Sequence, residues 1–376
     1  MNGNAINAEC QRLVDEAVAS GEQTGVQFCA WQDGRLVADV WAGRLSPGGA
    51  PVDGDTLFPI FSTGKPLLST AVHRAVELGL MDYDKPISTW WPEFTGDGKE
   101  RLTLRETLGY RTGMPGACPG KLKDRDIADW ALAVRTAAAD KPHCRPGTKQ
   151  EYLPYAYAWL LGHPLEVAAG KPLDEALREL VLSPAGIEGK FYFAAPRGVF
   201  GRIAAYSGND FCEIMNNDWA REACLPSAWS VSSARALCAF YHRLCGFDGR
   251  APLIRKGTLD EALKPCRDES DPLPSPESLV KDWHMIFGMG YGLWGEYGHI
   301  DRVFGHGGAG GSEGLVDRDK RLVVAYTCNV ARNDVALRDS LYAAVGMRWR
   351  YWKDSVSVQD IQMKAAKDKE LKVAGK

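Results

Sequence analysis

The stretch Phe61-Ser62-Thr63-Gly64-Lys65-Pro66 decides how the rest of the chain is interpreted. Pro66 lacks an N–H and is tolerated only in the first turn of a helix, so a helix is predicted to begin close to Ser62. Ser62 and Lys65 then lie three residues apart on one helical face, where their side chains can touch. Free N–H groups at such a helix start can stabilise an acyl oxyanion. Apolar residues continue at helical spacing up to Gly79: Leu67, Leu68, Ala71, Val72, Ala75 and Leu78.

Two further segments weigh against the simpler interpretation of Ser-x-x-Lys, an N-cap serine followed by an exposed lysine. In residues 146–162, Tyr152 stands just before the apolar run of a predicted helix, a position from which its hydroxyl can face a cleft. Tyr155 and Tyr157 follow and are expected to pack in the core or to line the cleft. Residues 304–312 read Phe-Gly-His-Gly-Gly-Ala-Gly-Gly-Ser, and such glycines let a strand approach a substrate closely.

Strand signals occur at both ends of the chain. Asp33-Gly34 separates two apolar-rich runs, 26–31 and 36–41, and therefore predicts an antiparallel hairpin. Further strands are predicted at residues 303–305, 315–316 and 322–328. Helical spacing predicts terminal helices over residues 7–19 and 334–352, and the middle of the chain is mostly helical or irregular.

These elements favour an α/β (α+β) fold in which an antiparallel sheet is flanked by the terminal helices. The predicted division is a discontinuous sheet domain of residues 1–80 and 285–361 and a mostly helical inserted domain of residues 81–284. A Lys-rich tail follows at residues 362–376. A cleft between the two domains is the natural place for a site.

Composition limits the possible functions. The 376 residues are 45% hydrophobic and 25% charged, as in a globular chain without membrane spans. A net charge of −3 with interspersed signs makes nucleic acid and anionic membrane unexpected partners. The first ten residues lack the features of a secretory signal, which favours a cytoplasmic location. The ten cysteines show no Cys-x-x-Cys and no Cys/His cluster at zinc spacing. Reduced structural thiols are therefore expected, with a cysteine nucleophile as a minor alternative, and neither a metal nor an organic cofactor is predicted.

The sequence resembles the penicillin-recognising serine hydrolases, that is class C β-lactamases, DD-peptidases and above all the β-lactamase-like family VIII carboxylesterases. The resemblance implies their fold, a nucleophile at Ser62, its partner Lys65, a tyrosine base at Tyr152 and a third-motif strand at His306-Gly307-Gly308. It also implies that the backbone N–H groups of Ser62 and Ala309 hold the oxyanion. Beyond these segments the likeness includes the following stretches: Trp91-Pro92-Glu93-Phe94, 102–108, 112–116, 226–228 and 234–237.

The residue types suit acyl transfer to serine. A serine hydroxyl needs a base, and no motif places a histidine beside it. A cationic Lys65 would lower the pKa of Tyr152 from about 10, so that a phenolate could take the Ser62 proton and later return one to the leaving group. Trp229 and Trp294 flank the motif segments and are candidates to line an apolar acyl pocket.

Two motifs depart from the lactamase pattern. Pro154 stands where those enzymes carry an asparagine that helps bind the substrate amide. His306 and Gly307 replace a lysine and a threonine that help bind a carboxylate, and an imidazole is mostly neutral near pH 7. Both changes favour a small uncharged ester as substrate, so the sequence predicts a hydrolase of short-chain carboxylic esters. The alternatives are a β-lactamase or D-amino-acid peptidase or amidase, an acyltransferase, and a non-catalytic binding protein of the same fold. The oligomeric state is not predicted.

Overall fold

The computed structural model describes residues 3–115, 122, 125–267, 286–294, 299–332 and 335–347. The predicted tail at 362–376, the end of the predicted helix 334–352 and Cys118 lie outside the described residues.

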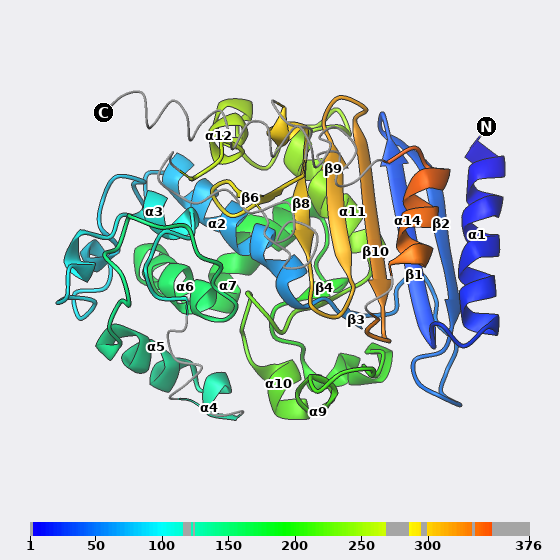
Figure 1. Ribbon diagram of the computed structural model, residues 1–376, viewed down its shortest axis with the longest axis horizontal. Helices are drawn as coiled ribbons and strands as arrows, with labels where there is room; N and C mark the ends of the chain where they lie inside the picture. Colours follow the sequence, from blue (N-terminus) through cyan, green and yellow to red (C-terminus); the bar gives the residue numbers. More distant parts are fainter. Residues whose placement is uncertain are drawn as a thin grey trace, which may run out of the picture.

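One antiparallel sheet joins the two ends of the chain, as predicted (Figure 1). Its seven strands follow the order β2-β1-β10-β9-β8-β7-β6, and a second, three-stranded sheet follows the order β3-β5-β4. The strands have these bounds: β1 (Gly25–Gln32), β2 (Arg35–Gly43), β3 (Phe58–Pro59), β4 (Phe191–Tyr192), β5 (Val231–Ser232), β6 (Ile286–Phe287), β7 (Gly292–Leu293), β8 (Val303–Gly307), β9 (Glu313–Asp317) and β10 (Leu322–Cys328).

The predicted hairpin is confirmed. Asp33 and Gly34 join β1 to β2 with φ values of 48° and 75°, the left-handed conformation that a two-residue hairpin turn needs. On its other side β1 pairs with β10, with Val26 opposite Cys328. The N-terminal hairpin is thereby fixed to the C-terminal strands.

Both faces of the sheet are buried. Along β10, Val323 and Ala325 lie in a larger core that includes residues of α2, whereas Leu322 and Val324 lie in a smaller core that includes residues of α1 and α14. Helix α11 packs against β1, β9 and β10, and α1 packs against β2 and α14. Figure 1 shows α1 and α14 at the end of the molecule farthest from α3, α5 and α6.

The described helices include the predicted N-terminal helix and the described part of the predicted C-terminal one. None of them is long and apolar enough to cross a membrane. Their bounds are: α1 (Gly3–Ala19), α2 (Lys65–Glu77), α3 (Leu104–Leu108), α4 (Arg125–Ala128), α5 (Trp130–Ala139), α6 (Ala156–Ala169), α7 (Leu173–Leu177), α8 (Ser183–Ala185), α9 (Cys212–Met215), α10 (Asp218–Glu222), α11 (Ala234–Cys245), α12 (Lys256–Ala262) and α14 (Ala336–Ala344), with the short helices η1 (Phe61–Gly64), η2 (Ile87–Thr89), η3 (Lys99–Arg101), η4 (Arg178–Leu182), η5 (Arg197–Arg202) and η6 (Ile300–Arg302).

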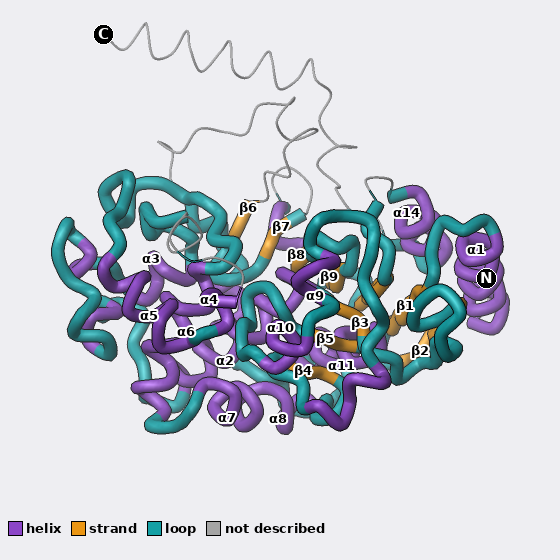
Figure 2. Tube along the Cα trace, turned by 90° about the horizontal axis from the view of Figure 1, so that it is seen from below, coloured by secondary structure: helices purple, strands orange, loops and turns teal. Residues whose placement is uncertain are grey.

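Helix α2 is buried around most of its circumference, not only along its apolar face. Its buried hydroxyls are satisfied within the helix, because Ser69 Oγ donates to the Lys65 carbonyl at 3.0 Å and Thr70 Oγ1 donates to the Pro66 carbonyl at 2.7 Å. The 3-10 helix η1 precedes α2, so Ser62 lies in a tight turn before the α-helix. Figure 2 shows α2 between the helical region around α6 and the strands.

Candidate active site

Phe61 forms a strained turn immediately before Ser62. Its φ of 51° lies in the left-handed region, which a bulky side chain rarely adopts. The ring packs against Tyr206 and Phe211, with centroid distances of 4.8 Å and 5.9 Å. Packing on both partners holds this conformation and fixes where Ser62 emerges.

Lys65 reaches three oxygen atoms from a fully buried position. Its Nζ lies 3.1 Å from Ser62 Oγ, 2.9 Å from the carbonyl oxygen of Pro154 and 2.6 Å from that of Ser227. Among the described residues, no carboxylate forms an ion pair with it. Burial lowers the pKa of Lys65 well below its ordinary value.

These contacts match the hydrogen-bonding capacity of an uncharged amine. A neutral amine has two hydrogens, which the two carbonyl oxygens of Pro154 and Ser227 accept, and one lone pair. The lone pair is then left for the hydroxyl of Ser62, which can donate to Nζ. The same three oxygen atoms can also accept the three hydrogens of a charged amine, and it is burial that favours the uncharged form.

Tyr152 lies beside the same serine, on the segment before α6. Lys65 Nζ lies 4.9 Å from its ring centroid, and the ring stacks on Phe287 at 5.5 Å and on Tyr110 at 5.8 Å. Loss of hydration raises the pKa of Tyr152, and the nearby Ser62 hydroxyl offsets this only in part. Burial therefore disfavours the predicted phenolate, and the role of Tyr152 as a base stays a prediction.

His306 is fully buried near Tyr152, with a centroid distance of 6.0 Å between the rings. Its Nδ1 lies 2.6 Å from the Gly307 carbonyl, which can only accept, so Nδ1 carries the proton. Burial is the main cause that lowers the pKa of His306, to about 3. This direction agrees with the expected neutral imidazole, and Nε2 has no hydrogen-bond partner among the described residues.

A glycine turn after β8 lies directly against η1. Gly308 N donates to the Ser312 carbonyl at 2.7 Å, and Thr63 Oγ1 donates to the same carbonyl at 3.0 Å. A Cβ atom on Gly308 would lie 2.3 Å from the Ile60 carbonyl oxygen. Only glycine permits this approach, which joins the strand to the turn that carries Ser62.

Two backbone N–H groups beside this junction have no acceptor in the described part of the chain. They belong to Ser62, in η1, and to Ala309, which is exposed and follows Gly308. Gly307 is half-buried at the end of β8, where it pairs with Glu313. Free N–H groups here can donate to an oxygen of a bound substrate.

The two candidate tryptophans lie in different places. Trp229 is buried in the larger core, and its ring meets that of Tyr155 edge-on at 6.3 Å. Ser227 Oγ donates to the Tyr155 carbonyl at 3.0 Å. Both rings therefore lie next to the two residues, Pro154 and Ser227, whose carbonyl oxygens bind Lys65. Trp294 lies in the smaller core, whereas the preceding Leu293 lies in the larger one. The prediction that Trp294 lines an acyl pocket is wrong, because successive strand residues face opposite sides of a sheet.

The sequence did not reveal three of the groups around Ser62. The carbonyl oxygens of Pro154 and Ser227 bind Lys65, but every residue has a carbonyl, so residue type gives no signal. Phe287 stacks on Tyr152 and lies 6.0 Å from His306. Its place is set by the pairing of β6 with β7, which the sequence analysis did not predict.

Comparison with known proteins places this geometry in a family. The family described as Beta-lactamase matches residues 10–346 of the sequence. The chain belongs to the beta-lactamase family. The esterase/beta-lactamase LipL of Mycobacterium tuberculosis is 25% identical over 348 residues, 84% of this chain and 79% of LipL. The esterase EstB of Burkholderia gladioli is 33% identical over 212 residues, which cover 50% of this chain and 52% of EstB.

The fold of the beta-lactamase family recurs in solved structures. A family VIII carboxylesterase superposes with a TM-score of 0.78 at 24% identity, covering 90% of this chain and 97% of the carboxylesterase. The D-amino acid amidase of Ochrobactrum anthropi superposes with a TM-score of 0.70 at 21% identity, covering 91% and 99% of the two chains. The predicted fold class is confirmed, and this chain is a β-lactamase-like serine hydrolase.

Proposed function

We propose that this hydrolase cleaves short-chain carboxylic esters through an acyl-enzyme at Ser62. The observation that carries the proposal is the buried amine of Lys65, whose hydrogens go to two carbonyl oxygens while Ser62 Oγ lies 3.1 Å away. In the first step Ser62 Oγ attacks the ester carbonyl carbon and its proton passes to Lys65 Nζ. The N–H groups of Ser62 and Ala309 donate to the oxyanion.

Tyr152 serves as the acid in this scheme. Because its pKa is raised, the phenol keeps its proton at neutral pH and can give it to the departing alkoxide. The proton that Lys65 received then restores the phenol. In the second step a water molecule attacks the acyl carbon, gives its proton to the same pair, and releases the acid and Ser62.

Two observations support an uncharged ester as the substrate. Pro154 is exposed and has no side-chain donor for a substrate amide. His306 is uncharged in its buried place, so it offers no standing positive charge to a carboxylate. A β-lactam drug or a peptide end would lose both contacts, whereas an acetyl or butyryl ester needs neither.

The nucleophile is tested by intact-mass measurement after treatment with a fluorophosphonate. One adduct is expected on the wild-type chain and on Ser183→Ala, which removes an exposed serine, and none on Ser62→Ala. A labelled Ser62→Ala chain that is folded by circular dichroism would contradict the assignment.

The substrate class is tested with nitrophenyl acetate, nitrophenyl butyrate and a chromogenic cephalosporin. The expected ratio of kcat/KM for the esters to that for the cephalosporin is well above one. A ratio below one would favour the lactamase alternative, and transfer of the acyl group to an added alcohol faster than to water would favour the acyltransferase.

A further inference from the structure

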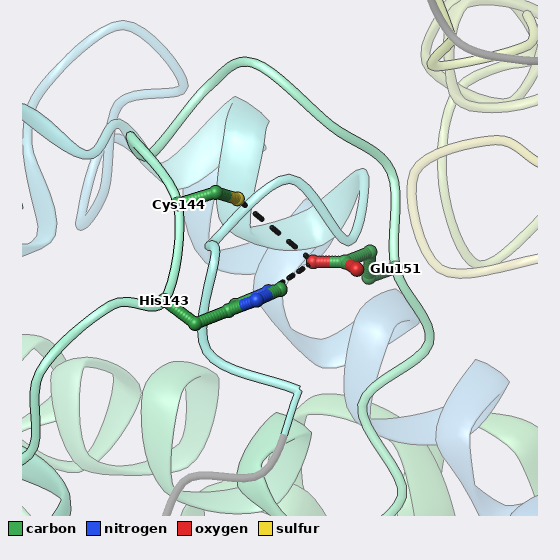
Figure 3. A group of neighbouring side chains, drawn as sticks. All are labelled: His143, Cys144 and Glu151. Atoms are coloured by element: carbon green, nitrogen blue, oxygen red, sulfur yellow. Dashed lines mark hydrogen bonds and ion pairs between the residues drawn. The ribbon is translucent and has the colours of Figure 1, made fainter.

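Three metal-binding side chain types converge on the loop that precedes Tyr152 (Figure 3). His143 Nε2 lies 2.5 Å from Glu151 Oε2, and Cys144 Sγ lies 3.9 Å from the same oxygen. The three potential ligand atoms all lie within 4.8 Å of one another. This group has no part in the hydrolytic scheme above. Its spacing along the chain matches neither Cys-x-x-Cys nor the usual Cys/His spacing of zinc sites.

The two oxygens of Glu151 have separate partners. Lys149 Nζ lies 2.6 Å from Oε1, whereas Oε2 faces His143 and Cys144. A cation that uses Oε2 therefore leaves the Lys149 ion pair in place. A thiolate and a carboxylate together neutralise a divalent cation, which limits repulsion by the exposed Lys149.

The ligand set selects the class of cation. Thiolate and imidazole ligands are preferred by Zn²⁺ and similar borderline-soft ions, and not by Mg²⁺ or Ca²⁺. Zinc bonds of about 2.0–2.3 Å at tetrahedral angles place ligand atoms about 3.3–3.6 Å apart. The sulfur-to-oxygen distance of 3.9 Å is already close to this range. The distance from His143 to Glu151 must widen by about 1 Å, and the imidazole has room to move because its side chain is 51% exposed.

The backbone holds the loop in place around this group. His143 N donates to the Gly113 carbonyl at 2.9 Å, and Glu151 N donates to the Tyr110 carbonyl at 2.8 Å. A Cβ atom on Gly113 would lie 2.4 Å from the Cys144 carbonyl oxygen. The backbones of His143, Cys144 and Glu151 are thus all held against residues 110–113, while the exposed imidazole of His143 leaves a path from solvent.

We propose that His143 Nε2, Cys144 Sγ and Glu151 Oε2 bind one divalent cation of the zinc class, with a fourth position open to water. On binding, the Cys144 thiol gives its proton to solvent. The proton through which His143 Nε2 donates to Glu151 also leaves Nε2, so that the imidazole binds through Nε2 with its remaining proton on Nδ1. The proposal does not depend on the hydrolytic function.

The test is titration of the metal-free full chain with Co²⁺, followed by displacement with Zn²⁺. One equivalent of Co²⁺ should produce a thiolate-to-cobalt charge-transfer band and the intense visible bands of four-coordinate cobalt, and Zn²⁺ should abolish both. Cys144→Ala should remove the charge-transfer band, and Glu151→Gln and His143→Ala should each weaken binding at least about tenfold. Cys212→Ala and His299→Ala, which remove a cysteine and a histidine elsewhere, should bind as the wild type does.

Circular dichroism identifies any variant that fails to fold, and Cys144→Ser then provides a milder replacement for the thiol. Absence of a thiolate band in the wild-type chain at equimolar Co²⁺ would overturn the proposal. An unchanged spectrum in Cys144→Ala, or unchanged affinity in both Glu151→Gln and His143→Ala, would overturn it as well.

Discussion

Burial favours the uncharged form of Lys65 in the fold more than in the unfolded chain. An ordinary lysine has a pKa of about 10.4, and burial lowers the pKa of Lys65 well below its usual value. Between these two pKa values the unfolded chain binds one proton more than the folded chain, so stability rises with pH. Below the folded pKa both states are protonated, and above the unfolded pKa both are neutral, so the dependence is confined to this window.

Lys65→Met should remove this pH dependence. We expect the free energy of unfolding of the wild type minus that of the variant to increase by about 1.4 kcal/mol for each pH unit within the window. Urea unfolding of both chains at several pH values between neutrality and about pH 10 measures this difference, in which the other lysines cancel. Parallel curves would mean that the folded amine is charged and cannot act as the base.

Tyr152→Phe should lower kcat for ester hydrolysis by about 10²–10⁴. The variant lacks the hydroxyl that, in the proposed scheme, protonates the leaving alkoxide. KM should change little, since the ring and its stacking on Phe287 remain. Tyr155→Phe is the matched control: its ring packs against Trp229, and its kcat should stay near the wild-type value. Steady-state kinetics with nitrophenyl butyrate decide between them, and a Tyr152→Phe chain of normal kcat would exclude the phenol from the reaction.

At the residue scale the sequence predicted which side chains meet, but not how burial affects the charges of Lys65 and Tyr152. Ser62, Lys65, Tyr152 and His306 were each identified from a short motif, and their contacts in the structure bring them together. The sequence analysis predicted a charged lysine and an ionised tyrosine. Desolvation disfavours both charges, and it depends on how many other segments cover a side chain, which no local pattern reports.

At the element scale, the contact between the β8 turn and η1 controls the site. Gly308→Ala would place a methyl group against the Ile60 carbonyl oxygen, 2.3 Å away. Because neither backbone segment can move without losing contacts, we expect a loss of about 1–3 kcal/mol in stability. We also expect kcat to fall at least about tenfold, because the N–H groups of Ser62 and Ala309 would move apart.

The matched control is Gly257→Ala in α12, where a new Cβ meets nothing within 4 Å. Alanine is the better helix former, so this variant should gain about 0.5–1 kcal/mol and keep its kcat. Thermal unfolding and ester kinetics on both variants provide the comparison. A Gly308→Ala chain with wild-type stability and kcat would show that the contact between the β8 turn and η1 is not tight enough to exclude a methyl group.

Elements were predicted where local chemistry determines them. The Asp33-Gly34 hairpin and the strands β8 to β10 follow from turn residues and apolar runs, and all were found. The side of the sheet that Trp294 faces was not predicted, because it depends on the register of β7, a strand of two residues. The group of His143, Cys144 and Glu151 was also missed, since an irregular loop brings it together.

At the scale of the whole molecule, the sheet separates two hydrophobic cores, and only one of them lies next to the candidate active site. The larger core surrounds α2 and includes Phe61, next to Ser62. The smaller core lies between the sheet and the helices α1 and α14. The sequence predicted that the terminal helices would cover the sheet, because strands at both chain ends need partners. The smaller core can therefore contribute to stability without touching the reacting atoms.

Leu341→Ala tests this separation. Leu341 lies in α14 and is fully buried in the smaller core, so its truncation should cost about 2–5 kcal/mol of stability. Because the sheet lies between it and Ser62, kcat/KM for nitrophenyl butyrate should stay at the wild-type value at a temperature where circular dichroism shows both chains folded. Leu36→Ala, at a position that is 48% exposed, should change stability by less than about 0.5 kcal/mol. A fall in kcat/KM of the folded Leu341→Ala chain would mean that the sheet transmits repacking to the site, and the two cores would have to be treated as one.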